Sequence, residues 1–241
     1  MVKNILSVAI IPARSGSKGL VDKNILELCG YPLMAWSIFA AKKSNIDEVI
    51  VSTDSHTYAE IAVRYGAKVP FLRPKEIADS KATDDQFINH AIQELNKDGI
   101  LPKYIIHLRP TTPTRRVSTV NNALSYIERV DIPYLRSCHL AAETPMKWYY
   151  KRKNQGISLS ETYLDQKPNL PRQAFENVYV PNGYVDILNV EHFKKHQDLY
   201  LNGLGIFETE EVIEIDNQND FDILKVISNG RDSEIYEELI K

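Results

Sequence analysis

The sequence has few of the residues that build covalent or metal frameworks, since it contains two cysteines among 241 residues and no CxxC pair. Cys29 and Cys138 lie far apart, so neither a disulfide framework nor a zinc cage is indicated. The apolar run in MVKNILSVAIIP is too short to span a bilayer and leads into a polar loop without a small-residue cleavage pattern. We therefore expect a cytoplasmic protein with no membrane partner.

The sequence also has little excess of charge of either sign. The formal net charge is -3, with 43% hydrophobic and 25% charged residues, which is typical of a globular protein. This balance does not indicate nucleic acid as a partner. The chain also lacks a Walker A motif, a G-x-G-x-x-G fingerprint and a G-x-S-x-G elbow, so nothing indicates a P-loop ATPase, a Rossmann dehydrogenase or a serine hydrolase.

What the sequence does contain is an alternation of short β-rich apolar runs with amphipathic stretches. This alternation is typical of βαβ units and predicts an α/β fold with a mostly parallel sheet and helices on both faces. The length suits a single domain, 1–241. We expect strands at 5–12, 48–52, 68–72, 104–108, 134–140, 147–153, 184–188, 204–207 and 211–215, and helices at 32–43, 56–65, 83–95, 117–130 and 221–228.

The rhythm of the sequence changes between 131 and 180. Within this region, 161–180 is rich in proline, asparagine and glutamine and has no clear period. An irregular stretch of this length inside a compact domain is usually functional, or it forms a protruding arm. We expect an insertion at about 131–180.

A basic loop follows the first predicted strand, in IIPARSGSKGLVDKN. It carries Arg14, Lys18 and Lys23, at the edge of the sheet where ligands of open α/β folds bind. Gly16 and Gly19 would let the backbone approach an anion, and the cations would neutralise the charges of a triphosphate. On spacing alone, a solvated loop with incidental cations explains the pattern equally well.

An acidic pair lies near the other end of the chain, in VIEIDNQNDF. Strand alternation would put Glu214 and Asp216 on one face, where two carboxylates can hold Mg²⁺ together with water and substrate phosphates. Taken alone, the segment is better explained as a solvent-facing edge strand before a helix that starts at Asn219 or Asp220.

Seven segments, in order, resemble the CMP-sugar synthetases, the acylneuraminate cytidylyltransferase family. IIPARSGSKGLVDKN is similar to the signature loop I-P-A-R-G-G-S-K-G followed by K-N, FLRPKEIADSKAT to R-P-x-x-L-A-x-D, and HLRPTTPTRR to Q-P-T-S-P-L-R. TPMKW, PRQAF and VPNGYVDI look like the family's lysine, R-Q and N-G-x-x-Y/D elements, and EIDNQNDF stands where the family has D-I-D-x-x-x-D. One element would be a weak signal, whereas seven in register over nearly the whole chain are specific.

The resemblance implies a nucleotide-diphospho-sugar-transferase fold, which is Rossmann-like, and a Mg²⁺-dependent enzyme. The implied reaction joins CTP to a 3-deoxy-2-keto sugar acid, a sialic-acid-like nonulosonate, to give CMP-sugar and pyrophosphate for lipopolysaccharide or capsule. It also implies a homodimer in which the 131–180 region reaches into the partner's active site. The alternatives are a 3-deoxy-octulosonate or sugar-1-phosphate substrate, and a non-catalytic nucleotide-binding homologue.

The resemblance also carries residue roles, position by position. Arg14, Lys18, Lys23 and Asp216 would be catalytic, and Glu214 and Asp216 would hold the metal. The sugar acid would meet Arg109, Lys147, Arg172 and Gln173. The nucleotide would meet Arg14, Ser15, Gly16, Ser17, Lys18, Lys23, Asn24, Arg73, Ser80, Thr83 and Asn182.

Three positions depart from the family pattern. Ser15 replaces a glycine, which is tolerable unless the position needs a positive φ. Arg109 replaces a glutamine, and a guanidinium only donates hydrogen bonds, so it would grip a carboxylate or phosphate. Glu214 replaces an aspartate and has a longer reach.

Overall fold

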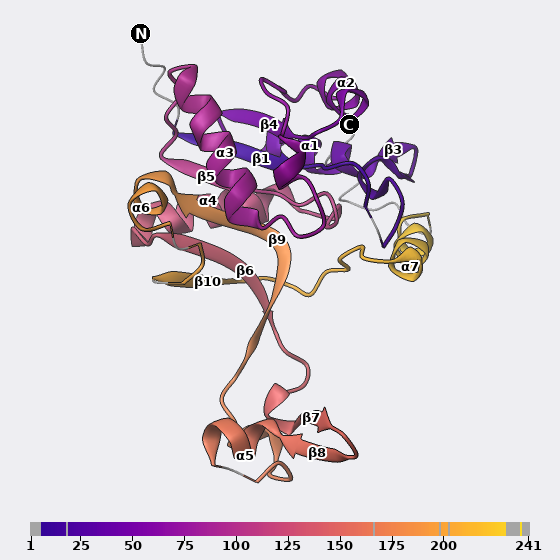
Figure 1. Ribbon diagram of the computed structural model, residues 1–241, viewed down its shortest axis with the longest axis vertical. Helices are drawn as coiled ribbons and strands as arrows, with labels where there is room; N and C mark the ends of the chain where they lie inside the picture. The colour runs from indigo at the N-terminus through magenta and orange to yellow at the C-terminus, as the bar shows by residue number, and fades with distance from the viewer. Residues whose placement is uncertain are drawn as a thin grey trace.

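A six-stranded sheet forms the centre of the molecule (Figure 1). The computed structural model describes residues 6–17, 19–165, 167–197, 199–201, 203–229 and 237. The strand order is β10-β6-β9-β5-β1-β4, and all neighbours are parallel except β9, which runs antiparallel to both β5 and β6. The predicted mostly parallel sheet is confirmed. The strands are β1 Ser7–Pro12, β4 Glu48–Ser52, β5 Tyr104–His107, β6 Tyr134–Leu140, β9 Tyr179–Asn189 and β10 Leu204–Glu208.

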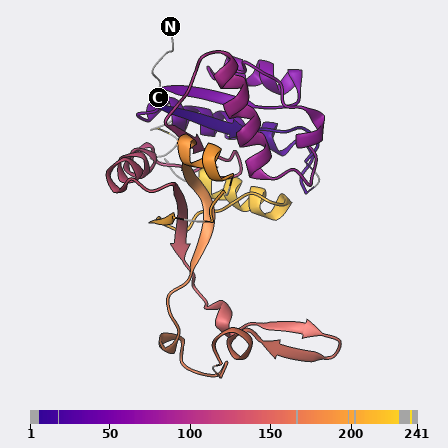
Figure 2. The same cartoon turned by 60° about the vertical axis from the view of Figure 1, so that its left-hand side comes forward.

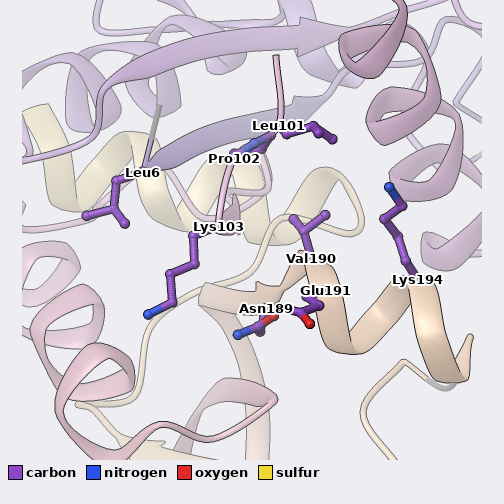
Figure 3. Close-up of a pocket in the computed structure, with 8 residues that line it drawn as sticks. All are labelled: Leu6, Leu101, Pro102, Lys103, Asn189, Val190, Glu191 and Lys194. Atoms are coloured by element: carbon purple, nitrogen blue, oxygen red, sulfur yellow. The ribbon is translucent and has the colours of Figure 1, made fainter. Parts of the chain in front are cut away.

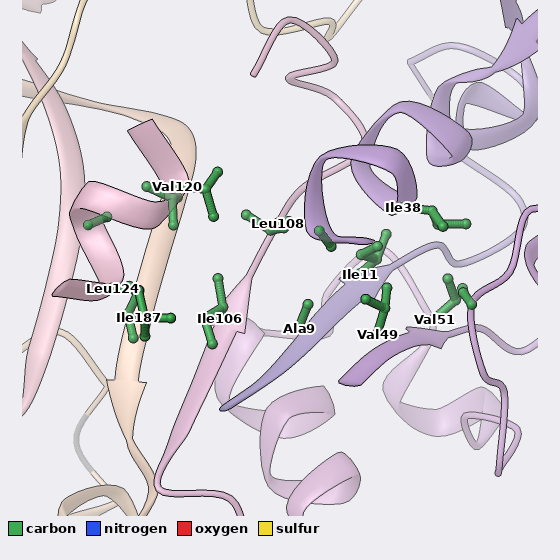
Figure 4. Close-up of a cluster of buried hydrophobic side chains, with 14 of the residues drawn as sticks. Ala9, Ile11, Ile38, Val49, Val51, Ile106, Leu108, Val120, Leu124 and Ile187 are labelled. Carbon is green, nitrogen blue, oxygen red and sulfur yellow. The ribbon is translucent and has the colours of Figure 1, made fainter. Parts of the chain in front are cut away.

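Helices cover both faces of the sheet, as predicted. On one face, apolar side chains of α1, α2 and α4 pack on the strands, and Figure 4 shows Ile38 and Leu124 approaching the sheet near Ile11 and Ile106. On the other face, α3 and α6 bury a second cluster. Helices cover the strands of this sheet on both sides. For this reason the sequence of β1 is a nearly continuous apolar run. The helices are α1 Leu33–Lys43, α2 His56–Arg64, α3 Asp84–Lys97, α4 Val117–Val130, α5 Leu159–Leu164, α6 Val190–His196 and α7 Gln218–Asn229.

Local signals in the sequence account for the helix ends beside the sheet. Ser55 caps α2 by accepting a hydrogen bond from the backbone N–H of Tyr58, and Gly66 follows the helix with φ of 89°. Thr83 and Gln86 form the predicted capping box at the start of α3. None of the helices in the described ranges is long and apolar enough to cross a membrane.

Two predicted strands are wrong. In 68–72, only Lys68 forms a β-bridge, with Ile50, because Pro70 has no N–H to extend the ladder. The stretch 211–215 is extended but is not a strand. Its alternation arises because Ile213 and Ile215 pack into the cluster beneath α1 and α7, not from pairing with a sheet.

A lobe projects from the body on the ends of β6 and β9 (Figures 1 and 2). It contains a hairpin of two antiparallel strands and the short helix α5, which was not expected in this irregular region. The predicted strand at 147–153 is confirmed in part, as β7. The hairpin strands are β7 Tyr149–Arg152 and β8 Gln155–Ser158, and 3-10 turns lie at Pro145–Lys147 (η3) and Arg172–Ala174 (η4).

Candidate functional site

A cleft of about 460 Å³ opens at the carboxyl ends of β1 and β5. This is where open α/β sheets bind ligands, because the loops that leave parallel strands converge at this edge. The cleft brings together residues that are up to 204 positions apart in the sequence, from Pro12 to Asp216. Among its lining residues are eight that the sequence predicted for the site: Arg14, Ser17, Lys23, Asn24, Arg73, Arg109, Glu214 and Asp216.

The two glycines of the basic loop have different structural roles. Gly16 has φ of 65°, a backbone conformation that side chains with a Cβ rarely adopt. Gly19 lies against the acidic segment, since a Cβ there would come within 2.8 Å of the backbone oxygen of Asp216. The small residue therefore lets the basic loop and the acidic segment meet. Lys18, predicted to bind phosphate, lies outside the described residues.

Ser15, which replaces a family glycine, is held by a carboxylate. Its backbone N–H donates to Oδ1 of Asp54 and its hydroxyl donates to Oδ2, both at 2.7 Å. Ser15 is not among the residues with positive φ, so a Cβ causes no backbone strain. Partial burial opposes the charge of Asp54, but the hydrogen bonds from Ser15 and the charge of Arg73 outweigh it and lower the pKa.

Buried contacts also fix the rest of the basic loop. Asn24 is buried and donates from Nδ2 to the backbone oxygen of Arg14 at 3.0 Å. The hydroxyl of Tyr58 donates to Oδ1 of Asp22 at 2.9 Å, just before the 3-10 turn η1, Lys23–Ile25. The loop thus has a defined shape although most of it is not in regular structure.

The predicted acidic pair lines the cleft beside the basic loop. The hydroxyl of Thr111 donates to Oε1 of Glu214 at 3.1 Å, and Lys23 Nζ lies 3.3 Å from Oδ1 of Asp216 and 2.7 Å from the backbone oxygen of Ile215. The Asp216 side chain is 72% exposed. The exposed carboxylate and the ammonium face the same cleft.

The donor chemistry of this pair fits Mg²⁺, which prefers carboxylate oxygens and retains water and phosphate ligands. Across the described part of the chain, no group of three or more His, Cys, Asp or Glu side chains is arranged to hold a metal. Glu214 and Asp216 both line the cleft, so their carboxylates are the residues there that could contact such an ion.

Arg73 lies at one end of the cleft and is buried. Its Nε and Nη2 donate to the hydroxyl and the backbone oxygen of Ser52, at 3.1 and 2.7 Å, and its guanidinium stacks 4.7 Å above the ring centre of Phe87. Burial is the main cause that lowers its pKa, to about 10, so it stays charged at neutral pH.

Arg109 lies in the cleft between two carboxylates. Its Nη1 donates to Oδ2 of Asp186 and its Nη2 donates to Oδ2 of Asp84, both at 2.6 Å. Burial opposes the charge of Arg109, but the two carboxylates outweigh it and raise the pKa above its usual value.

Arg115 is fully buried and ties the loop after β5 to the sheet. Its guanidinium donates to the backbone oxygens of Arg109, Gly183 and Tyr184 and to the hydroxyl of Ser37. Burial lowers its pKa to about 9. Because the loop carries both Arg109 and Thr111, Arg115 fixes the parts of the cleft that contact the acidic residues.

Six other predicted residues do not line this cleft. Thr83 is taken up in the cap of α3, and Asn182 is buried, with Nδ2 donating to Oγ1 of Thr209 at 2.7 Å. Arg172 and Gln173 line a separate cavity of about 390 Å³ in the lobe. The remaining two are Ser80, which is exposed in a turn, and Lys147, at the end of η3.

A larger cavity, of about 520 Å³, lies at the amino ends of β1 and β5 and contains none of the predicted residues (Figure 3). Leu6, Leu101 and Val190 line it, and Lys103 and Lys194 point away from one another. Because its polar groups do not converge, it does not form a charged-ligand site.

Sequence reasoning missed five residues that shape the cleft. Signals were present for four of them: Asp54 lies in TDSH, after β4, His107 and Arg115 lie in HLRPTTPTRR, and Asp186 lies in VPNGYVDI. Asp84 could be found only from its contact with Arg109. The five are Asp54, Asp84, His107, Arg115 and Asp186.

Comparisons with known proteins show which family the chain resembles. A family model described as cytidylyltransferase matches residues 8–239. An N-acylneuraminate cytidylyltransferase of Escherichia coli is 33% identical over 229 residues, which cover 93% of this chain and 52% of the relative. The chain thus spans about half the length of that relative. A pseudaminic acid cytidylyltransferase of Campylobacter jejuni is 26% identical, with 92% of this chain and 95% of the relative covered.

A solved structure shares the fold. It is that of a CMP:2-keto-3-deoxy-manno-octonic acid synthetase complexed with CTP, with a TM-score of 0.70 and 16% identity over 93% of this chain and 99% of that one. At this identity the likeness concerns the fold alone.

Proposed function

The chain belongs to the cytidylyltransferase family of CMP-sugar synthetases, and we propose that it joins CTP to a nonulosonic acid, giving CMP-sugar and pyrophosphate. The observation that carries the proposal is the meeting of the basic loop with Glu214 and Asp216 in one cleft. Cations and carboxylates that lie next to each other suit a magnesium-bound triphosphate.

The anomeric 2-hydroxyl of the sugar acid attacks the α-phosphorus of CTP in this proposal. The new oxygen–phosphorus bond forms as the bond from the α-phosphorus to the oxygen that bridges it to the β-phosphate breaks, and the hydroxyl's proton passes to the surrounding water. Such a displacement depends on in-line alignment and charge neutralisation more than on a covalent nucleophile. Arg14, Lys18 and Lys23 would bind the phosphates and stabilise the departing pyrophosphate, and Ser15, Gly16, Ser17 and Asn24 would shape and line the phosphate loop.

Glu214 and Asp216 would hold the Mg²⁺ ion. When bound, the ion would neutralise phosphate charge and lower the pKa of the attacking hydroxyl. The contact between Lys23 and Asp216 would be exchanged for contacts to phosphate, which is consistent with the exposure of that carboxylate.

Arg73 is proposed to meet the cytosine and ribose, because its planar guanidinium offers donors in a fixed geometry and lines the cleft. Ser80, Thr83 and Asn182 are proposed to act near the nucleotide, Ser80 from a turn, Thr83 from the start of α3 and Asn182 from β9.

The sugar acid would also meet the lobe. Arg172 and Gln173 line a cavity in the lobe itself, with Lys147 nearby in sequence, so we propose a homodimer in which each lobe completes the partner's cleft. The support is an exposed set of aromatic side chains on the lobe, with Trp148, Tyr149 and Tyr163 at 54%, 58% and 62% exposed. Residues 1–241 would then form one cytidylyltransferase domain in a cytoplasmic enzyme.

The decisive experiment measures pyrophosphate release by the full chain with CTP, Mg²⁺ and a panel of nonulosonic acids, with 3-deoxy-octulosonate included. Release with a nonulosonic acid is expected. Release only with the octulosonate would reassign the substrate, and CTP binding without any release would identify a non-catalytic nucleotide-binding protein.

The shared site has its own test. Lys23→Ala and Arg172→Ala variants are each expected to be nearly inactive, and a mixture of the two after subunit exchange is expected to regain activity, because hybrid dimers contain an intact site. A monomer in sedimentation, or no recovery in verified hybrids, would contradict the dimer.

A further inference from the structure

Three neighbouring strands bring charged and polar side chains together at one end of the cleft. His107 of β5 and Arg136 of β6 are both Cα partners of Asp186 in β9. Directly paired residues point to the same face of a sheet, so the three side chains lie in one row. Arg109 follows β5, and Asp84 reaches it from the first turn of α3. We call these five residues the floor of the cleft.

The charges of the floor cancel. Arg109 is held at 2.6 Å by both Asp84 and Asp186, and Arg136 Nε lies 3.8 Å from the same oxygen of Asp186. Two guanidinium charges therefore balance two carboxylate charges. Arg109 still has three N–H groups beyond those in the two hydrogen bonds, and its side chain is 16% exposed at the cleft.

His107 is a polar side chain of the floor that is left unsatisfied. It lines the cleft, is 1% exposed, and within the described residues neither ring nitrogen has a hydrogen-bond partner. Its Nδ1 is 3.9 Å from Asp84 Oδ2, beyond hydrogen-bond reach. Burial, and then the charges of Arg109 and Arg115, hold its pKa well below the usual value. The neutral ring has one donor and one acceptor, and buried groups of this kind are normally paired.

We propose that Arg109 and His107 form a subsite for a neutral hydrogen-bonding substituent of the sugar acid, a hydroxyl or an acylamino group, and that Asp84 and Asp186 position Arg109 for it. The inference rests on the proposed function. An amide oxygen or a hydroxyl oxygen accepts from Arg109, and the N–H or O–H of the same group donates to the imidazole.

This assignment differs from the expectation for an arginine at this position, which was to grip a carboxylate or phosphate. From the sequence alone, no partner is predicted for the charge of the Arg109 guanidinium. In the structure that charge is already paired with Asp84 and Asp186, and an incoming carboxylate would be desolvated beside Asp84. A neutral group loses less on desolvation and matches the donors and the acceptor present.

The test uses two nonulosonic acids, one with an acylamino substituent and one with hydrogen in its place. In the chain 1–241, His107→Phe is expected to raise the KM for the substituted acid about fivefold, the size of one neutral hydrogen bond, without changing the KM of CTP. The unsubstituted acid should show no change. His90→Phe, the same substitution in α3 outside the cleft, is the matched control and should alter neither KM.

A second pair of variants separates recognition from folding. Arg109→Gln alone leaves Asp186 undercompensated and is expected to lower the melting temperature and abolish the preference for the substituted acid. Arg109→Gln with Asp186→Asn replaces the charged pair by a neutral one, and is expected to restore both the melting temperature and most of the preference.

The outcomes distinguish the inference from the proposed function. If the wild-type protein neither binds nor turns over any nonulosonic acid, the proposed function fails and the subsite fails with it. If turnover is normal but His107→Phe shifts the KM of both acids equally, only the subsite is overturned. Equal loss of both acids in the folded double variant would instead show that Arg109 binds the carboxylate.

Discussion

The two sides of the cleft differ in how their charges are held. The rim, formed by the basic loop 14–24 and the acidic segment 211–216, has a long contact between Lys23 and an Asp216 that is 72% exposed. On the floor, Arg109 has two contacts of 2.6 Å and its partner Asp186 is 1% exposed. Rim charges pair loosely with each other, so a ligand can replace those contacts at low cost. Floor charges are fixed, so they can discriminate between ligands but not move to meet them.

The largest expected effect is on the free energy of unfolding, and it concerns the buried residue Arg115. Arg115→Met is expected to reduce the free energy of unfolding by more than about 3 kcal/mol, because it leaves buried carbonyl oxygens of the loop and β9 without donors. Urea denaturation followed by circular dichroism measures the loss. Arg116→Met removes a half-exposed arginine that lies 3.6 Å from Glu210, and should cost less than about 1 kcal/mol. Equal losses of unfolding free energy in Arg115→Met and Arg116→Met would contradict the distinction between a buried, fixed arginine and a half-exposed one.

On the rim, the corresponding change affects turnover and not stability. Lys23→Ala is expected to slow turnover ~10²-fold or more, since one contact to the developing charge is worth about 2 to 4 kcal/mol of barrier. The rate of pyrophosphate release at saturating substrates measures it. Lys103→Ala, at the opposite end of β5, is the matched control and should leave the rate unchanged. Near-normal CTP turnover in Lys23→Ala would remove the rim from the mechanism.

The sequence predicted the rim far better than the floor. The rim lies in two short contiguous segments, and their motif spacing is visible before any fold is known. The floor joins residues 25 and 77 positions apart, and its contacts depend on β9 running antiparallel between β5 and β6. The stretch 184–188 could be predicted as a strand, but alternation does not reveal its neighbours. For the same reason alternation predicts a strand in the acidic segment, which alternates without pairing.

Screening by salt should further distinguish the charges of the rim from the buried charges of the floor. Raising ionic strength from about 0.1 M to about 1 M shortens the Debye length from about 10 Å to about 3 Å, so exposed charges attract CTP less. The KM of CTP is expected to rise severalfold with excess Mg²⁺ held constant. Steady-state assays over this range should show a shallower rise in Lys23→Ala than in the wild type, whereas Lys103→Ala should follow the wild type. Parallel slopes in all three proteins would contradict a role for Lys23 in attracting CTP.

The smallest expected effect tests how the rim is anchored to the body. Asp54 has a lowered pKa in the folded protein, so its contacts with Ser15 add stability above the unfolded pKa of about 3.9, and this stability is lost as pH falls through the folded value. Asp54→Asn lacks this titration. The melting temperature of the wild type should therefore exceed that of Asp54→Asn by a constant margin above about pH 5, and the margin should shrink below about pH 4. Ser15→Gly, which removes the hydroxyl donor, should reduce the same margin. A margin that grows on acidification would mean that Asp54 binds its proton more tightly when folded, and that Ser15 does not anchor the loop through the carboxylate.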